Sequence, residues 1–178
     1  MRELNVCLEA CENALDTSLL LAERIANFLK DEGVEFERCS NIPHLSLYQF
    51  NSENNKQKII QKELCSIAKD HKPISFLMDS RVEIVGNNIF WRSRAALDNS
   101  HLMNLLENVV EKLSLFKSIQ PLQQIRDRFD LLSQDQKMLV SKYGVYWGLP
   151  YNFDPHITLI YNLSRTDVSI KKSLEKIN

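Results

Sequence analysis

Two short phrases of this sequence pair a histidine with a hydroxyl residue at a spacing that suits acid–base chemistry. Both phrases follow a proline and alternate polar with apolar residues. Side chains at positions i and i+2 of a strand point to the same side, so each histidine would share a face with its hydroxyl partner. Two imidazoles and two hydroxyls brought together are the groups needed for metal-free acid–base chemistry on a phosphodiester. The residues concerned are His44 and Ser46 in the first phrase and His156 and Thr158 in the second.

Phosphodiester cleavage needs a base that accepts a proton and an acid that protonates the leaving oxygen. An unperturbed imidazole titrates near pH 6.5, so two histidines can divide these roles at working pH. Hydroxyl donors aimed at the phosphate oxygens would stabilise the developing charge. The sequence leaves open which histidine is the base. The simpler alternative is two histidines at strand starts, each hydrogen-bonded to a carbonyl oxygen.

The duplicated His-apolar-Ser/Thr-apolar motif resembles that of the two-histidine (2H) phosphoesterase superfamily, which includes 2′-5′ RNA ligase-like proteins and cyclic phosphodiesterases. The resemblance rests on His44-Leu-Ser-Leu-Tyr, on Asp-Pro-His156-Ile-Thr-Leu and on the order of elements between them. It implies two pseudo-symmetric lobes that each contribute one motif to a central cleft. It also implies an RNA-processing hydrolase that opens 2′,3′-cyclic phosphates, or cleaves or joins 2′-5′ linkages, on RNA ends or small nucleotides.

Size and charge narrow the range of partners. A chain of 178 residues suits one domain over 1–178. Its net charge of −1 argues against long DNA or RNA and favours a small nucleotide or an RNA 3′ end. The most apolar stretch, 19–22, is too short to span a membrane. We expect a monomer.

Metals, cofactors and disulfides are not expected. The sequence has no dense cluster of Asp, Glu and His, and with only 4 Gly it lacks a phosphate-cradling loop. Asp154 is expected to be a turn residue before Pro155. The cysteines form no CxxC pair, and without a secretory leader they indicate reduced thiols in a cytoplasmic protein. They are Cys7, Cys11, Cys39 and Cys65.

Strands and helices alternate in two batches, each containing one motif, which predicts an α+β fold. With the resemblance, the expectation is a single bilobal domain with two mostly antiparallel sheets, helices packed outside and a central cleft. A helix is expected from a cap at Asp16 to Gly33, others follow the polar turn 51–55 and Pro121, and further helices are expected over 99–116 and 167–176. Strands are predicted over 4–8, 34–36, 42–50, 74–78, 81–85, 88–94 and 155–162.

Several other residues are candidates for substrate contacts. Tyr48 should share the face of the first motif, where it could touch base or phosphate; a packed strand tyrosine is equally consistent. The loop before the second motif could stack a base or cover the core, and its aromatic residues are Trp147, Tyr151 and Phe153. Arg126, Arg128 and Lys137 are expected on a solvated helix face, with a phosphate clamp as the alternative.

Two other functions compete with the enzyme. A binding module would grip phosphorylated RNA ends or nucleotides without turnover, and a structural α+β domain would carry the motifs by accident. A matched acid–base pair favours catalysis, because a pure binder does not need one.

Overall fold

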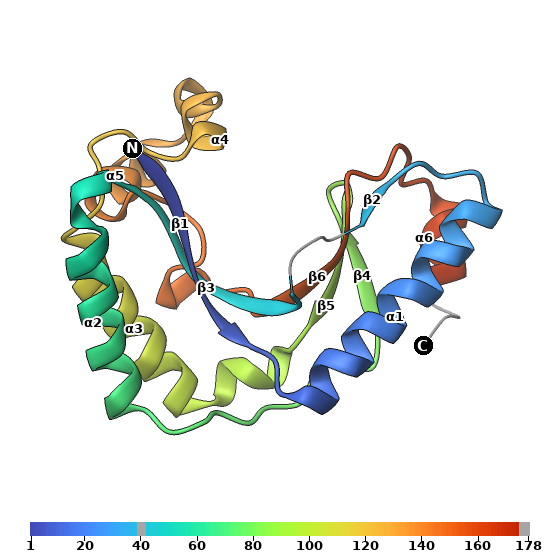
Figure 1. Ribbon diagram of the computed structural model, residues 1–178. Helices are drawn as coiled ribbons and strands as arrows, with labels where there is room; N and C mark the ends of the chain where they lie inside the picture. Colours follow the sequence, from blue (N-terminus) through green and yellow to red (C-terminus); the bar gives the residue numbers. More distant parts are fainter. Residues whose placement is uncertain (39–41, 175–178) are drawn as a thin grey trace. The chain divides into compact units, whose positions relative to one another are not determined.

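The computed structural model describes residues 1–38 and 42–174 (Figure 1). The chain divides into two compact units, each assembled from three segments. Unit 1 comprises Met1–Cys7, Leu47–Ser75 and Asn99–Phe153, and unit 2 comprises Leu8–Ser46, Phe76–Asp98 and the described part of Asp154–Asn178. Helices and strands occur in both units, which confirms the α+β class.

The strands belong to one sheet in the order β1-β3-β6-β5-β4, with β2 also paired to β6. The β2–β6, β3–β6, β4–β5 and β5–β6 pairings are antiparallel. Two separate sheets and a bilobal shape are not shown and stay predictions. The strands are β1 (Arg2–Glu9), β2 (Glu37–Arg38), β3 (His44–Ser52), β4 (Val82–Val85), β5 (Asn88–Arg92) and β6 (His156–Tyr161).

The helices begin and end at recognisable caps. The Asn99 side chain accepts a hydrogen bond from the Leu102 amide and starts α3, whereas Gly144, with φ of 82°, ends α5. Three-residue or five-residue 3-10 turns cover Asn54–Lys56, Arg94–Asp98, Phe129–Leu131 and Pro150–Asn152. The helices are α1 (Glu12–Asp31), α2 (Gln57–Asp70), α3 (Ser100–Ser114), α4 (Gln123–Arg126), α5 (Gln134–Tyr143) and α6 (Val168–Leu174).

Three local predictions are wrong. The segment 34–36 is not a strand, and the strand of this region is β2, which lies further along the chain. Helix α1 starts at Glu12 after Cys11, whose carbonyl accepts from the Leu15 amide at 2.8 Å, so Asp16 lies inside the helix rather than at its cap. The segment 74–78 is not a strand. Its contact with the end of β5 consists of isolated bonds, such as the Ser93 hydroxyl donating to the Leu77 carbonyl, and no ladder forms.

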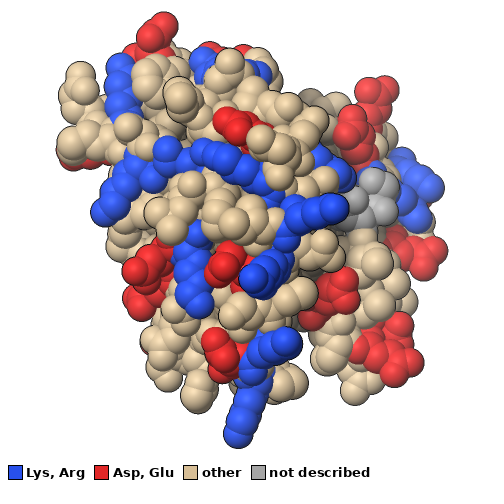
Figure 2. Space-filling view, turned by 60° about the vertical axis from the view of Figure 1, so that its left-hand side comes forward, with Lys and Arg blue, Asp and Glu red and all other residues tan. Residues whose placement is uncertain are grey.

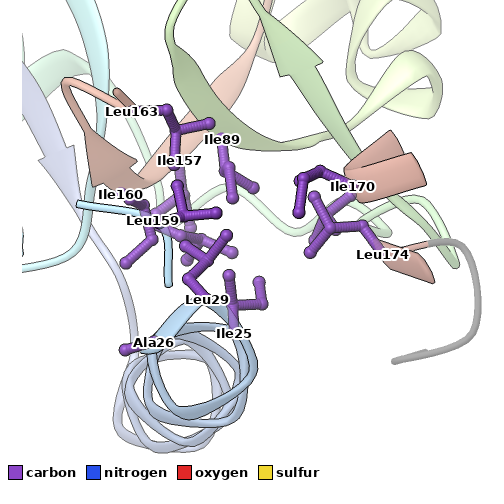
Figure 3. Close-up of a cluster of buried hydrophobic side chains, with 12 residues drawn as sticks. Ile25, Ala26, Leu29, Ile89, Ile157, Leu159, Ile160, Leu163, Ile170 and Leu174 are labelled. Atoms are coloured by element: carbon purple, nitrogen blue, oxygen red, sulfur yellow. The ribbon is translucent and has the colours of Figure 1, made fainter. Parts of the chain in front are cut away.

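The core of unit 2 fixes the orientation of β6 (Figure 3). Apolar residues of α1, β5, β6 and α6 bury one face of the strand almost completely. Ile89 pairs with Ile160 and Phe90 with Thr158, so Leu159 is the extra residue of a bulge, and both Leu159 and Ile160 are buried. Burying each such side chain contributes about 1.5–3 kcal/mol. The polar residues of β6 are therefore held on the opposite face.

Unit 1 is built around α3, which contributes Leu102, Leu106 and Leu113 to a fully buried row beside α2. Of the cysteines in the described ranges, Cys7, Cys11 and Cys65 are exposed and form no disulfide with one another, and Cys39 lies outside those ranges. None of the helices within 1–38 and 42–174 is both long and apolar enough to cross a membrane.

Candidate functional site

The two motifs begin the neighbouring strands β3 and β6, and their histidines and hydroxyl residues all belong to unit 2. Leu45 of β3 and Ile157 of β6 are antiparallel partners, and both are buried. In an antiparallel pair the residues that flank Leu45 and Ile157 also lie opposite one another. His44 therefore lies opposite Thr158, and Ser46 lies opposite His156. These four polar residues are half-buried and alternate with buried apolar ones, as the sequence predicts. The structure thus brings both histidines and both hydroxyls to one face of the sheet.

The four residues occupy the corners of a rectangle. Directly opposite residues of an antiparallel pair have Cβ atoms about 4.5–5.5 Å apart, and diagonal ones about 7–8 Å. The histidines His44 and His156 lie on one diagonal, and the hydroxyls of Ser46 and Thr158 lie on the other. The centre of the rectangle is therefore flanked by imidazoles in one direction and by hydroxyls in the other. A phosphate group placed there could meet all four side chains.

Both imidazoles are oriented by the same hydrogen bond. Nδ1 of His44 lies 2.8 Å from the carbonyl oxygen of Ile42, and Nδ1 of His156 lies 2.7 Å from that of Asp154. A carbonyl oxygen only accepts, so Nδ1 donates in each ring, and Nε2 is the nitrogen at which a neutral ring can take up a proton. These are the carbonyl bonds of the simpler alternative. They are equally the bonds that a catalytic histidine needs to fix its tautomer, so they do not separate the two interpretations.

Strand β5 adds a third column to this face. Phe90 pairs with Thr158, and Arg92 pairs with His156. The Phe90 ring stacks on the His156 imidazole with centroids 3.8 Å apart and planes at 14°. Burial lowers the pKa of His156 below its ordinary value of 6.5, and the charges of Arg92 and His44 lower it further against the hydrogen bond and charge of Asp154. The His156 ring is therefore held neutral at neutral pH.

Arg92 joins the site to a network of ion pairs. Its guanidinium contacts Glu83 at 2.8 Å and Asp154 at 2.9 Å, and Arg94 contacts Asp79 and Glu83. Asp154 thus links Arg92 to the backbone segment that orients His156, and is more than the turn residue expected from the sequence. The Nε atom of Arg92 is buried and makes no hydrogen bond with the described residues. Sequence reasoning missed Phe90 and Arg92; their alternation within the predicted strand 88–94 is the one signal of a shared face.

The other predicted contacts lie in unit 1. Tyr48 is only 2% exposed, and its hydroxyl donates to the Tyr143 carbonyl. It is the packed tyrosine of the alternative interpretation, because β3 has Leu47 and Tyr48 buried in succession and the alternation of the motif stops there. Trp147 is half-buried against Tyr146, and Tyr151 is exposed. A substrate-binding role for these last two residues stays a prediction.

Phe153 is buried and covers the core, as one of the two interpretations expected. Within the described ranges no three His, Cys, Asp or Glu side chains gather as a metal-binding group would. No family model, curated protein or solved structure matches this chain. The interpretation of the site therefore rests on its own geometry and on the motif resemblance.

Proposed function

We propose that this protein is a metal-independent phosphodiesterase that acts on 2′,3′-cyclic phosphates or 2′-5′ linkages of small nucleotides or RNA 3′ ends. The observation that carries the proposal is the rectangle of two histidines and two hydroxyls on one face of unit 2. Each motif alone supplies one histidine and one hydroxyl. Together they supply a matched acid–base pair and two hydrogen-bond donors, which phosphodiester cleavage requires.

The diagonal arrangement suits an in-line displacement. The attacking and leaving oxygens stand on opposite sides of the phosphorus, as His44 and His156 stand on opposite sides of the rectangle. Nε2 of one neutral imidazole accepts a proton from water while the water oxygen bonds to phosphorus. The bond from phosphorus to the leaving ribose oxygen breaks, and the other, protonated imidazole donates its Nε2 proton to that oxygen. Water and the cyclic diester are thereby converted to a monoester.

The role of base falls to His156 in this proposal. Burial lowers the pKa of His156 and keeps its ring neutral, so it can accept a proton over a wider pH range. His44 then donates to the leaving oxygen. In the reverse, ligating direction the two roles exchange. Ser46 and Thr158 donate to the non-bridging oxygens, where charge accumulates in the transition state.

A binding module that grips phosphorylated RNA ends in the same place is the alternative. It would need donors and positive charge, but not two imidazoles that are both oriented through Nδ1 and can both gain or lose a proton at Nε2. The proposal also includes a monomer in the cytoplasm and a two-lobed domain. The two histidines and two hydroxyl residues all belong to unit 2, so they are not divided between the two units. It assigns no cofactor and no metal.

The test is turnover of a nucleoside 2′,3′-cyclic phosphate in EDTA. Replacing His44 or His156 by alanine should each remove most activity, because an acid or base contributes about 10²–10⁴-fold. His101, an exposed histidine of α3, provides the control variant His101→Ala. Binding without turnover would replace the enzyme by the binding module. Loss of activity in EDTA with rescue by a divalent ion would replace the two-histidine mechanism.

A further inference from the structure

Unit 1 carries a pocket that the proposed function does not use. Its volume is about 480 Å³, within the range of small-molecule sites. It lies among the segments around α4 and α5. Its lining includes three basic side chains and an aromatic ring, but no Asp or Glu. The residues used below are Lys117, Arg126, Lys137, Phe129 and Ile119.

The positive charge of this pocket is not neutralised by ion pairs. Arg126 donates to two neutral side chains, to Gln120 at 3.1 Å and to Gln123. The Lys137 ammonium lies 5.5 Å from the centre of the Phe129 ring. No carboxylate of the described residues forms a salt bridge with Lys117, Arg126 or Lys137. The guanidinium is thus held in place while its charge stays available for an anion.

The apolar part of the lining is also accessible. Phe129 is 37% exposed and Ile119 is 98% exposed, both unusually open for residues of this size. A planar ring beside three cations is the combination by which proteins bind nucleotides, with the base stacked on the ring and the phosphate on the cations. Local positive charge is compatible with the net charge of −1, because Lys and Arg gather unevenly over the surface, as the band of blue side chains in Figure 2 shows.

We infer that this pocket binds a nucleoside phosphate, with the phosphate held by Lys117, Arg126 and Lys137 and the base stacked against Phe129. The ligand is either a free mononucleotide or one nucleotide of a single-stranded RNA. The inference does not depend on turnover at the histidines, because it concerns other residues of unit 1 and a binding event alone.

The experiment measures binding of two probes that the proposed enzyme cannot cleave. One is adenosine 5′-monophosphate, and the other is a single-stranded 2′-O-methyl oligoadenylate, each titrated by calorimetry. The pocket variant is Arg126→Gln with Lys137→Gln. The matched control is Lys62→Gln with Lys69→Gln, which removes the same charge from exposed positions of α2. Phe129→Leu keeps an apolar side chain and removes the stacking surface.

The pocket variant should weaken binding at least about tenfold, because it removes two charge-assisted contacts. Phe129→Leu should weaken it by about 5- to 150-fold, since stacking on an aromatic ring contributes about 1–3 kcal/mol per base. The salt dependence of oligonucleotide binding should have a slope of about −0.7, because one phosphate is neutralised, and the slope should be shallower in the pocket variant. The control should stay within twofold of the parent protein.

The two probes distinguish a mononucleotide ligand from an RNA strand. Binding of both probes identifies the mononucleotide as the sufficient unit, and binding of the oligonucleotide alone identifies an RNA strand as the ligand. Equal losses in the pocket variant and its control would overturn the inference, as would binding lost only in His44→Ala, which would assign the ligand to the histidine site. Equal affinity for inorganic phosphate or a polyglutamate peptide would reduce the pocket to a general anion site. If the pocket variant keeps its cyclic phosphate turnover, nucleotide binding in the pocket is independent of catalysis at the histidine site, and each proposal can be tested without the other.

Discussion

Replacing Thr158 by valine isolates one hydroxyl of the proposed site. Thr158 is half-buried in β6, between His44 and Phe90, and its hydroxyl makes no hydrogen bond to another residue that the structure describes. Valine has the same branched shape and is equally suited to a strand. The change should therefore alter the free energy of unfolding by less than about 1 kcal/mol, and any larger effect on turnover belongs to the reaction.

The expected loss follows from the position of the hydroxyl. Thr158 lies on the diagonal opposite Ser46, so each donates to a different non-bridging oxygen of a phosphate at the centre. Removing one preorganised donor costs about 10²–10³ in kcat, which corresponds to about 2.7–4 kcal/mol. KM should change little, because the charge that the hydroxyl meets develops mainly in the transition state. Ser46→Ala should give a loss of the same order.

The assay is steady-state hydrolysis of a nucleoside 2′,3′-cyclic phosphate in EDTA, with urea unfolding as the measure of stability. The control is Thr17→Val on α1, an exposed threonine whose hydroxyl donates to the Asn13 carbonyl at 2.8 Å. A kcat within threefold of the parent value would refute a contact between the Thr158 hydroxyl and the reacting phosphate. A rise in KM alone would assign the hydroxyl to substrate binding only.

Three further predictions concern the surrounding residues. His44→Ala and His156→Ala should each reduce kcat/KM by about 10²–10⁴, and the double variant should be little worse than either, because the pair acts as a unit; additive losses would contradict this. Because the pKa of His156 lies below 6.5, the acidic limb of the pH profile of kcat/KM should also lie below pH 6.5. Phe90→Ala should admit water to the imidazole, raise the pKa of His156 and move this limb to higher pH. An unmoved limb would argue against His156 as the base. Arg92→Met removes two partly exposed ion pairs, while Glu83 keeps its contact with Arg94, and it should lower the free energy of unfolding by about 1 kcal/mol in urea titrations, with an unchanged midpoint as the contrary result.

Local signals in the sequence predict much of the fold. The strands predicted over 81–85 and 88–94 are observed as the β4–β5 hairpin, which turns at Gly86 and Asn87, and the helix expected over 99–116 is observed as α3, which starts at the side-chain cap of Asn99. The wrong start of α1 has a simple cause. An acidic residue is favourable both at the cap and within the first turns, so Asp16 alone does not locate the boundary. The failed strand over 74–78 meets the end of β5 through isolated hydrogen bonds and forms no ladder, and sequence pattern does not reveal how a segment meets its neighbours.

The site shows the same division between local and long-range information. Alternation within each motif is local, and it correctly predicts that each histidine shares a face with its hydroxyl partner. Which residue of one motif lies opposite which residue of the other depends on the pairing of strands distant in sequence. The same applies to Phe90 and Arg92, which reach the site only because β5 pairs with β6. Tyr48 is buried because alternation breaks at Leu47, a break that the residue types do not signal.

The register of β3 against β6 is therefore the feature on which the proposed chemistry depends. A slip of one residue would turn the histidine and hydroxyl of one motif to the opposite face of the sheet. A slip of two residues would keep all four side chains on the same face, but one residue of each motif would then lie opposite a residue outside the other motif. The partners Leu45 and Ile157 prevent the first slip, because both are buried and exposing either would cost about 1.5–3 kcal/mol. The bulge at Leu159 and the burial of Ile160 in the core of unit 2 fix the position of β6, the strand with which β3 pairs. The apolar residues of the two motifs thus determine the position of the histidines as directly as the polar residues determine their chemistry.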